Sequence, residues 1–201
     1  MKITTLEVYP YFFSNMKRLD ALSNDELTLC KIVNSLEGTL EAKIKKLIED
    51  DVFNAYRRIH AEYFQLFLVE EESCQKIEIL KRIIFLNWLS MLEPSFLTGI
   101  DNLDTTVVID SFSYLNNYLA VGKIDSEFRW MLSFYSSWDY ILLGFANNSL
   151  EQLTTFVRDV DRSLFHVPKD LNREMMTNRG QMGIYWSTYI IEEKGLKESR
   201  K

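Results

Sequence analysis

The sequence predicts an all-α protein, a compact bundle of about six to seven antiparallel helices, and three observations support this. Apolar residues recur every three to four positions through most of the chain from Asn24 onward, which is the period of an amphipathic helix. The 7 Gly and 3 Pro residues are few for a chain of 201. No sequence period repeats, which favours a closed bundle over a regular solenoid, with irregular α-α superhelical packing as the alternative.

Length and composition predict one domain. A chain that is 47% hydrophobic and 26% charged can bury a large core at this length. We expect residues 1–201 to form a single all-α domain, with residues 1–20 as an N-terminal extension and residues 196–201 as a frayed tail. The first residues lack the apolar core of a secretory signal, and the most apolar run, residues 83–92, is about half as long as a bilayer span. The sequence therefore predicts a cytoplasmic protein without membrane contact.

Two capping boxes predict helix starts, at residues 23–26 and 149–152. Each has a serine that can accept an orphan backbone N–H and a Glu or Gln three residues later that can reach back. After the first box, one stripe of apolar residues shares a single helix face: Leu29, Val33, Leu36, Leu40, Ile44 and Leu47. We therefore expect one long surface helix that continues through Gly38.

The next two helices are expected to form the interior. Residues 52–70 have a broad aromatic face, so this helix should lie deep in the core. Residues 73–92 have no charge after Arg82 and are apolar on nearly all sides from Ile83 onward. That pattern is typical of a helix surrounded by others, and we expect it at the centre of the bundle.

Three further helices are expected at about 104–120, 125–146 and 150–165. A last helical stretch should begin near Pro168, whose fixed φ suits a first helical turn. Residues 183–191 are rich in β-branched and aromatic side chains, as strands are, but their apolar residues recur at three and four positions and favour a helix. Residues 3–13 stay ambiguous because Pro10 lies in their middle.

Sequence motifs for metal, nucleotide and nucleophile chemistry are missing. His60 and His166 are the only histidines, and neither lies in an HExxH or ExxH pattern. Residues 101–104 resemble a calcium loop only briefly, because Leu103 stands where that loop needs Asp or Asn. Cys30 and Cys74 lack metal-site spacing and are interpreted as buried free thiols. We therefore expect no metal, no cofactor and no enzymatic activity.

Two ionisable residues are nevertheless expected among apolar neighbours. Asp139 falls near the middle of the apolar arc of the helix expected at 125–146, and His60 lies between Phe53 and Phe67 on its own helix. A buried carboxylate must be paired, hydrogen-bonded or protonated. One hypothesis is an acid–base pair lining an aromatic pocket, in a helical enzyme or small-ligand sensor. The other is that both are hydrogen-bonded structural groups of the core.

Acidic charge is concentrated in residues 93–161, whose formal charge is −7 while that of the whole chain is −6. Within this region, residues 93–104 form the longest segment not assigned to a helix, and they mix carboxylates with apolar side chains. Such loops often bind partners, because apolar side chains supply contact area while acids steer a basic surface. The alternative is that Phe96 and Leu97 close the end of the bundle while the acids are solvated.

We therefore expect a non-enzymatic protein that binds a basic protein partner through an acidic helical and loop surface. The candidate binding residues are Glu93, Phe96, Asp101, Asp104, Asp125 and Glu127. An immunity or antitoxin-type inhibitor would fit by size and charge. The negative net charge disfavours nucleic acid as the principal ligand. A scaffolding homo-oligomer is a third hypothesis, in which exposed Trp130 or Phe134 would supply the subunit interface.

Overall fold

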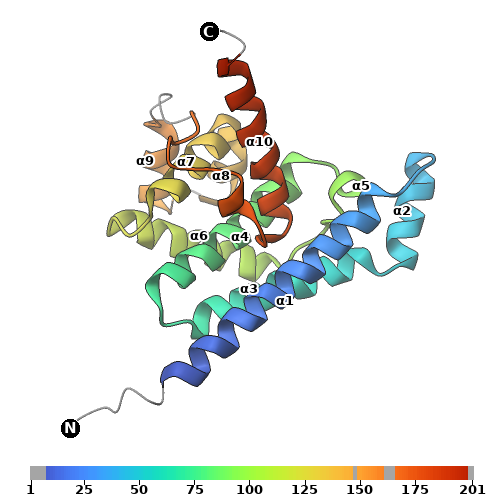
Figure 1. Cartoon of the computed structure of the whole chain (residues 1–201), viewed down its shortest axis with the longest axis horizontal. Helices are drawn as coiled ribbons and strands as arrows, with labels where there is room; N and C mark the ends of the chain where they lie inside the picture. The colour runs from blue at the N-terminus through green and yellow to red at the C-terminus, as the bar shows by residue number, and fades with distance from the viewer. Residues whose placement is uncertain (1–7, 147–148, 161–165, 199–201) are drawn as a thin grey trace.

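All regular secondary structure is helical within the residues that a computed structural model describes, which are 8–146, 149–160 and 166–198. This confirms the all-α prediction, although the helices are more numerous than expected and several are shorter (Figure 1). The α-helices are α1 (Val8–Asn34), α2 (Leu40–Glu49), α3 (Val52–Val69), α4 (Ser73–Leu92), α5 (Ser95–Thr98), α6 (Thr105–Ala120), α7 (Ser126–Tyr135), α8 (Asp139–Ala146), α9 (Glu151–Arg158) and α10 (Gly180–Glu198). Two 3-10 turns are η1 (Ser136–Trp138) and η3 (Glu174–Met176).

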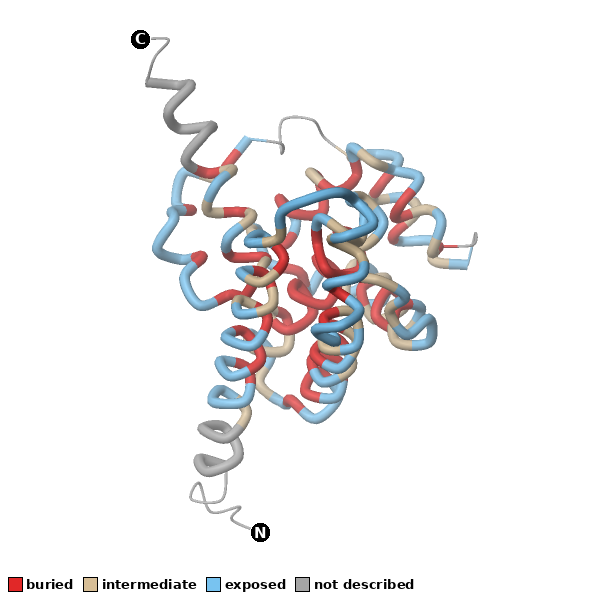
Figure 2. The backbone as a smooth tube through the Cα atoms, turned by 90° about the vertical axis from the view of Figure 1, so that its right-hand side faces the viewer, coloured by how far each residue is buried: buried red, intermediate tan, exposed pale blue. Residues whose placement is uncertain are grey.

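Helix α4 lies at the centre of the bundle, as its charge-free second half predicts. Every residue from Ile79 to Leu89 is buried, including Lys81, Arg82 and Asn87. Figure 2 shows the buried segments gathered in the middle of the molecule, with exposed backbone around them. Helices α3 and α10 are among the helices that pack around α4. The buried polar side chains of α4 therefore need hydrogen-bond or ion-pair partners within the protein.

Helix α1 begins well before the first capping box, so the start predicted at Ser23 is wrong. Leu19 and Leu22 are buried and extend the apolar face backward along α3, which makes a continuous helix more favourable than a new start. Pro10 lies in the first turn of α1, where its missing N–H costs nothing. Residues 8–20, expected as an extension, therefore form the first half of α1, and residues 1–7 lie outside the described residues.

The long helix expected through Gly38 is two helices. Gly38 has a φ of 101°, a conformation that ends the helical path, and the Thr39 side chain then accepts a hydrogen bond from the N–H of Ala42 at the start of α2. Both helices keep their share of the apolar stripe, since Val33 and Leu47 are buried. Periodicity alone therefore missed the break, although glycine followed by threonine is a recognisable stop and cap signal.

The helix expected at 125–146 is also interrupted, by η1 between α7 and α8. Helix α9 begins at Glu151, close to the predicted start, but its first free N–H groups are capped from another helix. Asn116 Oδ1 accepts hydrogen bonds from Gln152 N at 2.9 Å and from Leu153 N at 3.1 Å. Helix α9 ends at Arg158, and residues 161–165 of the predicted helix lie outside the described residues.

The last long helix starts at Gly180 and not near Pro168. The preference for helix over strand at residues 183–191 is confirmed, since α10 runs through them to Glu198. Residues 196–198 of the expected frayed tail therefore belong to α10, and residues 199–201 lie outside the described part of the chain.

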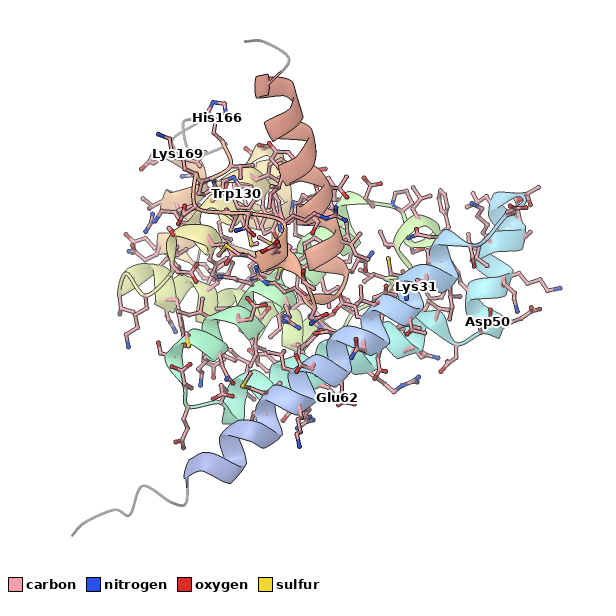
Figure 3. All side chains as sticks on the ribbon, in the orientation of Figure 1. Lys31, Asp50, Glu62, Trp130, His166 and Lys169 are labelled. Carbon is pink, nitrogen blue, oxygen red and sulfur yellow. The ribbon has the colours of Figure 1, made fainter. Side chains whose placement is uncertain are left out.

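Aromatic side chains fill the space between α4, α7 and α10. The ring centroids of Trp88 and Tyr135 lie 4.5 Å apart, and those of Trp130 and Trp186 lie 4.4 Å apart. Trp130, labelled in Figure 3, is 2% exposed, so it is part of the core. Phe134 is half-buried, and its ring centroid lies 5.1 Å from that of Trp186. The proposed use of Trp130 in a subunit interface is thereby wrong, since packing within one chain already occupies its ring.

Candidate functional site

The loop between α4 and α6 is built around Gly99. Its φ of 73° turns the chain after α5, and its Cα lies so close to the core that a Cβ would be 2.7 Å from Val33 and 2.9 Å from Tyr56. Ile100, the next residue, is 1% exposed. The middle of the loop is therefore fixed by packing, and its polar residues are held at the surface on either side.

Hydrogen bonds hold the second half of the loop. Arg57 Nε on α3 donates to the Asp101 carbonyl oxygen at 3.1 Å. Asn102 adopts a left-handed conformation, with a φ of 47°, and its Nδ2 donates to the Asp101 carboxylate at 2.7 Å. Asp104 then caps α6, because its Oδ1 accepts from Thr106 N at 2.8 Å. The loop is thus a defined structure that presents its carboxylates in fixed places.

Two grooves adjoin this loop and share Ser95 and Asp101 in their walls. The larger, of about 540 Å³, lies between the end of α4, the loop and α6. Its lining combines apolar and polar residues, among them Met91, Ile100, Leu103, Val108, Phe145, Glu93 and Asn102. The smaller, of about 320 Å³, lies against α2 and α3 and is lined by residues that include Ile44, Ile48, Phe53, Asp51 and Arg57. Together they give the loop a concave, partly apolar surface on two sides.

The carboxylates of this loop have no ion-pair partner within the part of the chain that the structure describes. Among the residues that the structure describes, none of Glu93, Asp101 and Asp104 forms an ion pair. Phe96 is half-buried against the core, whereas Leu97 is 49% exposed. The two residues thus differ: Phe96 partly closes the end of the bundle, as the alternative interpretation expected, and Leu97 stays accessible beside the acids.

Asp125 and Glu127 do not join this surface. Helix α7, which they begin, lies on the left of Figure 1, whereas α5 lies on the right. Lys81 Nζ donates to Asp125 Oδ2 at 2.7 Å and to Glu127 Oε2 at 2.8 Å. Their charges are therefore offset internally, and the single acidic surface expected from the sequence is divided into two parts of different character.

The second part belongs to an ionic network around the buried cations Lys81, Arg82 and Arg179, which the sequence patterns did not predict. Arg179, just before α10, donates from Nε to Glu78 Oε1 at 2.8 Å and also bonds Glu78 Oε2 and Glu127 Oε1. Arg82 Nε donates to the same Glu78 oxygen at 2.9 Å. Burial raises the pKa of Glu78, but Arg179 and Arg82 outweigh this and hold it below its ordinary value. The network ties α4, α7 and the start of α10 together.

Glu26 is a buried acid and the residue that the first capping box misassigned. It is 1% exposed, accepts a hydrogen bond from the Tyr63 hydroxyl at 2.8 Å and another from the N–H of Gln181 at 2.6 Å. Burial raises its pKa to about 7, against the opposing effects of Tyr63, Gln181 and Arg82. The sequence contains a signal for this burial, because Ser23 and Glu26 lie at helical spacing among apolar residues of α1. The buried positions of this face are Leu19, Leu22, Ser23, Glu26, Cys30 and Val33.

The hypothesis of an acid–base pair between His60 and Asp139 is wrong. Asp139 is exposed at the start of α8, because η1 changes the angular phase that a continuous helix would have given it. His60 is fully buried, and its Nε2 lies 2.8 Å from Asn87 Oδ1, while Asn87 Nδ2 donates to Ser111 Oγ at 2.8 Å. Burial lowers the pKa of His60 to about 4, despite the bond to Asn87. His60 is thus a neutral, hydrogen-bonded core residue.

No protein-family model, curated protein or solved structure matches this chain. In the described part of the chain, no three His, Cys, Asp or Glu side chains group in a way that could hold a metal ion. The described helices also include none with the length and apolar character that crossing a membrane requires. Cys30 is buried, as expected, but Cys74 is exposed.

Proposed function

We propose that this protein is a non-enzymatic binding protein whose acidic loop surface contacts a basic surface of another protein. The acidic loop surface comprises Glu93, Asp101 and Asp104 with the exposed apolar residues Met91 and Leu97 beside them. The observation that carries the proposal is that Glu93 and Asp101 line adjoining grooves, that Asp104 lies between two residues lining the larger one, and that none of the three forms an ion pair within the described residues.

Charge and rigidity both support this proposal. Carboxylates that are not paired internally attract a basic partner from a distance and speed its association. The bond from Arg57 and the packing of Gly99 already fix the loop, so binding would cost little additional conformational entropy. Met91 and Leu97, which are 56% and 49% exposed, supply apolar area that would be buried on association.

Within this class, we favour a cytoplasmic inhibitor of a basic protein, of the immunity or antitoxin type. Such an inhibitor needs a preformed, negatively charged surface and no catalytic groups of its own. Asp125 and Glu127 are left out of the proposed surface, because Lys81 and Arg179 occupy their carboxylates.

A charge-reversal experiment tests the proposal. The double variant Glu93→Lys/Asp101→Lys changes the acidic loop surface and leaves Asp104 as the cap of α6. The control Asp25→Lys/Glu71→Lys makes the same change in net charge at exposed acids on α1 and in the turn before α4. Partners captured from cells of the source organism would be identified by mass spectrometry, and the affinity of each purified partner then measured at several salt concentrations.

We expect a basic partner whose affinity for the wild type falls as the salt concentration rises. In Glu93→Lys/Asp101→Lys this affinity should be at least about tenfold lower than in the wild type. In the control variant it should change less than about twofold. Equal loss in both variants would show that net charge alone matters, and unchanged affinity in both would show that this surface is not used. Either result rejects the proposed site.

A further inference from the structure

Glu26 connects helices that are far apart in the sequence. The Tyr63 hydroxyl on α3 donates to its Oε2 at 2.8 Å, and the backbone N–H of Gln181 donates to its Oε1 at 2.6 Å. The first N–H groups of a helix have no acceptor within the helix, and Gln181 lies in the first turn of α10. Glu26 therefore caps α10 with a side chain from a helix 155 residues earlier.

The contact between Glu26 and α10 is close. A Cβ on Gly180 would lie 2.5 Å from Glu26 Oε2, and Gly180 has a φ of 59°, so the position suits glycine on both grounds. The backbone of α10 thus packs directly on the carboxyl group. Any change in the hydration of Glu26 must be accommodated by movement of α1 or of the start of α10.

Among the described residues, the cation that faces Glu26 is Arg82, and its guanidinium is hydrogen-bonded to other side chains. The titratable and charged groups that face Glu26 are Cys30 from α1, Tyr56 and Tyr63 from α3, and Arg82 from α4, while α10 contributes backbone N–H groups. Arg82 Nε donates to Glu78 Oε1 at 2.9 Å, and Arg82 also bonds Ser23 Oγ. Within the described residues, Glu26 forms no ion pair, and burial raises its pKa to about 7.

We infer that Glu26 is a proton-controlled latch that holds the start of α10 against α1 when protonated and releases it when ionised. Burial without an ion-pair partner among the described residues favours the neutral carboxyl group, and this outweighs the hydrogen bonds donated to its two oxygens, which favour the ionised form. Loss of the proton leaves a buried charge without a counter-ion, which is unfavourable unless water reaches it. Separation of the first turn of α10 from α1 admits that water with the least loss of core packing.

A surface groove at the same junction would report this movement. The groove, of about 250 Å³, is lined by Met16 and Leu19 of α1, by Arg82 of α4 and by residues 177–179, which lead into α10. Its two sides are therefore the two elements that the latch joins. Release of the latch would widen the groove, and protonation would restore its closed form.

Hydrogen exchange of the Gln181 amide tests the latch. Protection factors, which remove the intrinsic effect of pH on exchange, would be measured by NMR at pH 6 and pH 8. We expect the protection of Gln181 to fall at least about tenfold at the higher pH in the wild type. Glu26→Gln should show no such fall, since its amide stays neutral, and Asp25→Asn, an exposed neighbour on α1, should behave like the wild type.

The carboxyl carbon of Glu26 gives a second measurement that does not need Glu26→Gln to fold. Its chemical shift should titrate with a midpoint near the pKa of about 7, and Tyr63→Phe should move the midpoint upward, because the tyrosine hydroxyl favours the ionised form. A midpoint below about 5, where an ordinary glutamate titrates, would overturn the inference. So would equal protection of Gln181 at both pH values in the wild type, or an equal fall in Glu26→Gln.

Discussion

Arg179 and Glu78 form a two-point ion pair across 101 residues of sequence, with Arg179 Nε 2.8 Å from Glu78 Oε1. Arg179 is 7% exposed and also bonds Glu127, so one guanidinium links α4 and α7 to the segment that leads into α10. Its planar donors suit this role, since a lysine offers a single ammonium and no fixed fork. The pair therefore sets where α10 begins on the body of the protein.

Removal of Arg179 should destabilise the protein strongly. Arg179→Met keeps much of the side-chain volume but leaves the partly buried carboxylates of Glu78 and Glu127 with fewer partners. We expect the free energy of unfolding, measured by chemical denaturation, to fall by about 3–5 kcal/mol. Arg179→Lys should lower the free energy of unfolding by less, because lysine keeps the positive charge although it lacks the planar donors of the guanidinium group.

An exposed ion pair is the control for Arg179. Arg18 lies 3.5 Å from Glu62, and both side chains are about half exposed, at 45% and 50%. Arg18→Met should change the free energy of unfolding by less than about 1 kcal/mol. A similar effect of Arg18→Met and Arg179→Met would show that the buried network contributes no more than a surface pair.

The Glu26 carboxyl should make stability fall as pH rises toward neutrality. Its pKa is about 7 in the folded protein against an ordinary value of 4.5, so the folded state binds more protons than the unfolded state between these values. This contribution is fully present below pH 4.5 and is lost as pH approaches 7, by on the order of 3 kcal/mol. The difference in unfolding free energy between the wild type and Glu26→Gln should follow this course, with no further change above pH 8. A difference that stays constant or grows over this range contradicts the raised pKa.

The sequence predicted those elements whose environment is set by the residues themselves. Residues 73–92 carry no charge after Arg82, so only a surrounded helix suits them, and α4 has the predicted bounds. The loop at residues 93–104 was also recognised, because its Pro, Gly and clustered acids do not support a long helix. The structure places Glu93 and Asp101 of this loop beside grooves, where their proposed role can be tested.

Elements that depend on distant partners could not be predicted in this way. Ser23 and Glu26 have the spacing of a capping box, but Glu26 bonds an amide 155 residues away, and no local pattern reveals that amide. A uniform helix over residues 125–146 would place Asp139 on an apolar arc, but the short η1 turn interrupts that helix and Asp139 is exposed. The burial of Lys81 could not be predicted for the same reason, since its ion pair with Asp125 depends on how α4 packs against the start of α7.

Substitutions at His60 and Asp139 should separate a core residue from a surface one. His60→Leu removes the ring that bonds Asn87 and leaves the buried Asn87 Oδ1 without a donor. The expected loss in unfolding free energy is about 1–3 kcal/mol. Asp139→Asn should change it by less than about 0.5 kcal/mol, because the residue is exposed. If both substitutions cost the same and a double substitution costs no more than either alone, the two side chains are coupled and the assignment of separate roles fails.

Two glycines on different helices provide opposite predictions for the same substitution. A Cβ on Gly183 in α10 would lie 2.2 Å from the carbonyl oxygen of Met176, a backbone atom that cannot move away without displacing η3. Gly183→Ala should therefore lower the thermal midpoint by several degrees, as a loss of about 2 kcal/mol or more would. A Cβ on Gly144 in α8 would meet nothing within 4 Å, so Gly144→Ala should gain helix propensity, up to about 1 kcal/mol, and raise the midpoint. Both variants can be compared by thermal denaturation under one condition. A stabilising effect of alanine at both positions would mean that η3 does not pack on α10 as described, because the carbonyl oxygen of Met176 is the closest atom that a Cβ on Gly183 would meet.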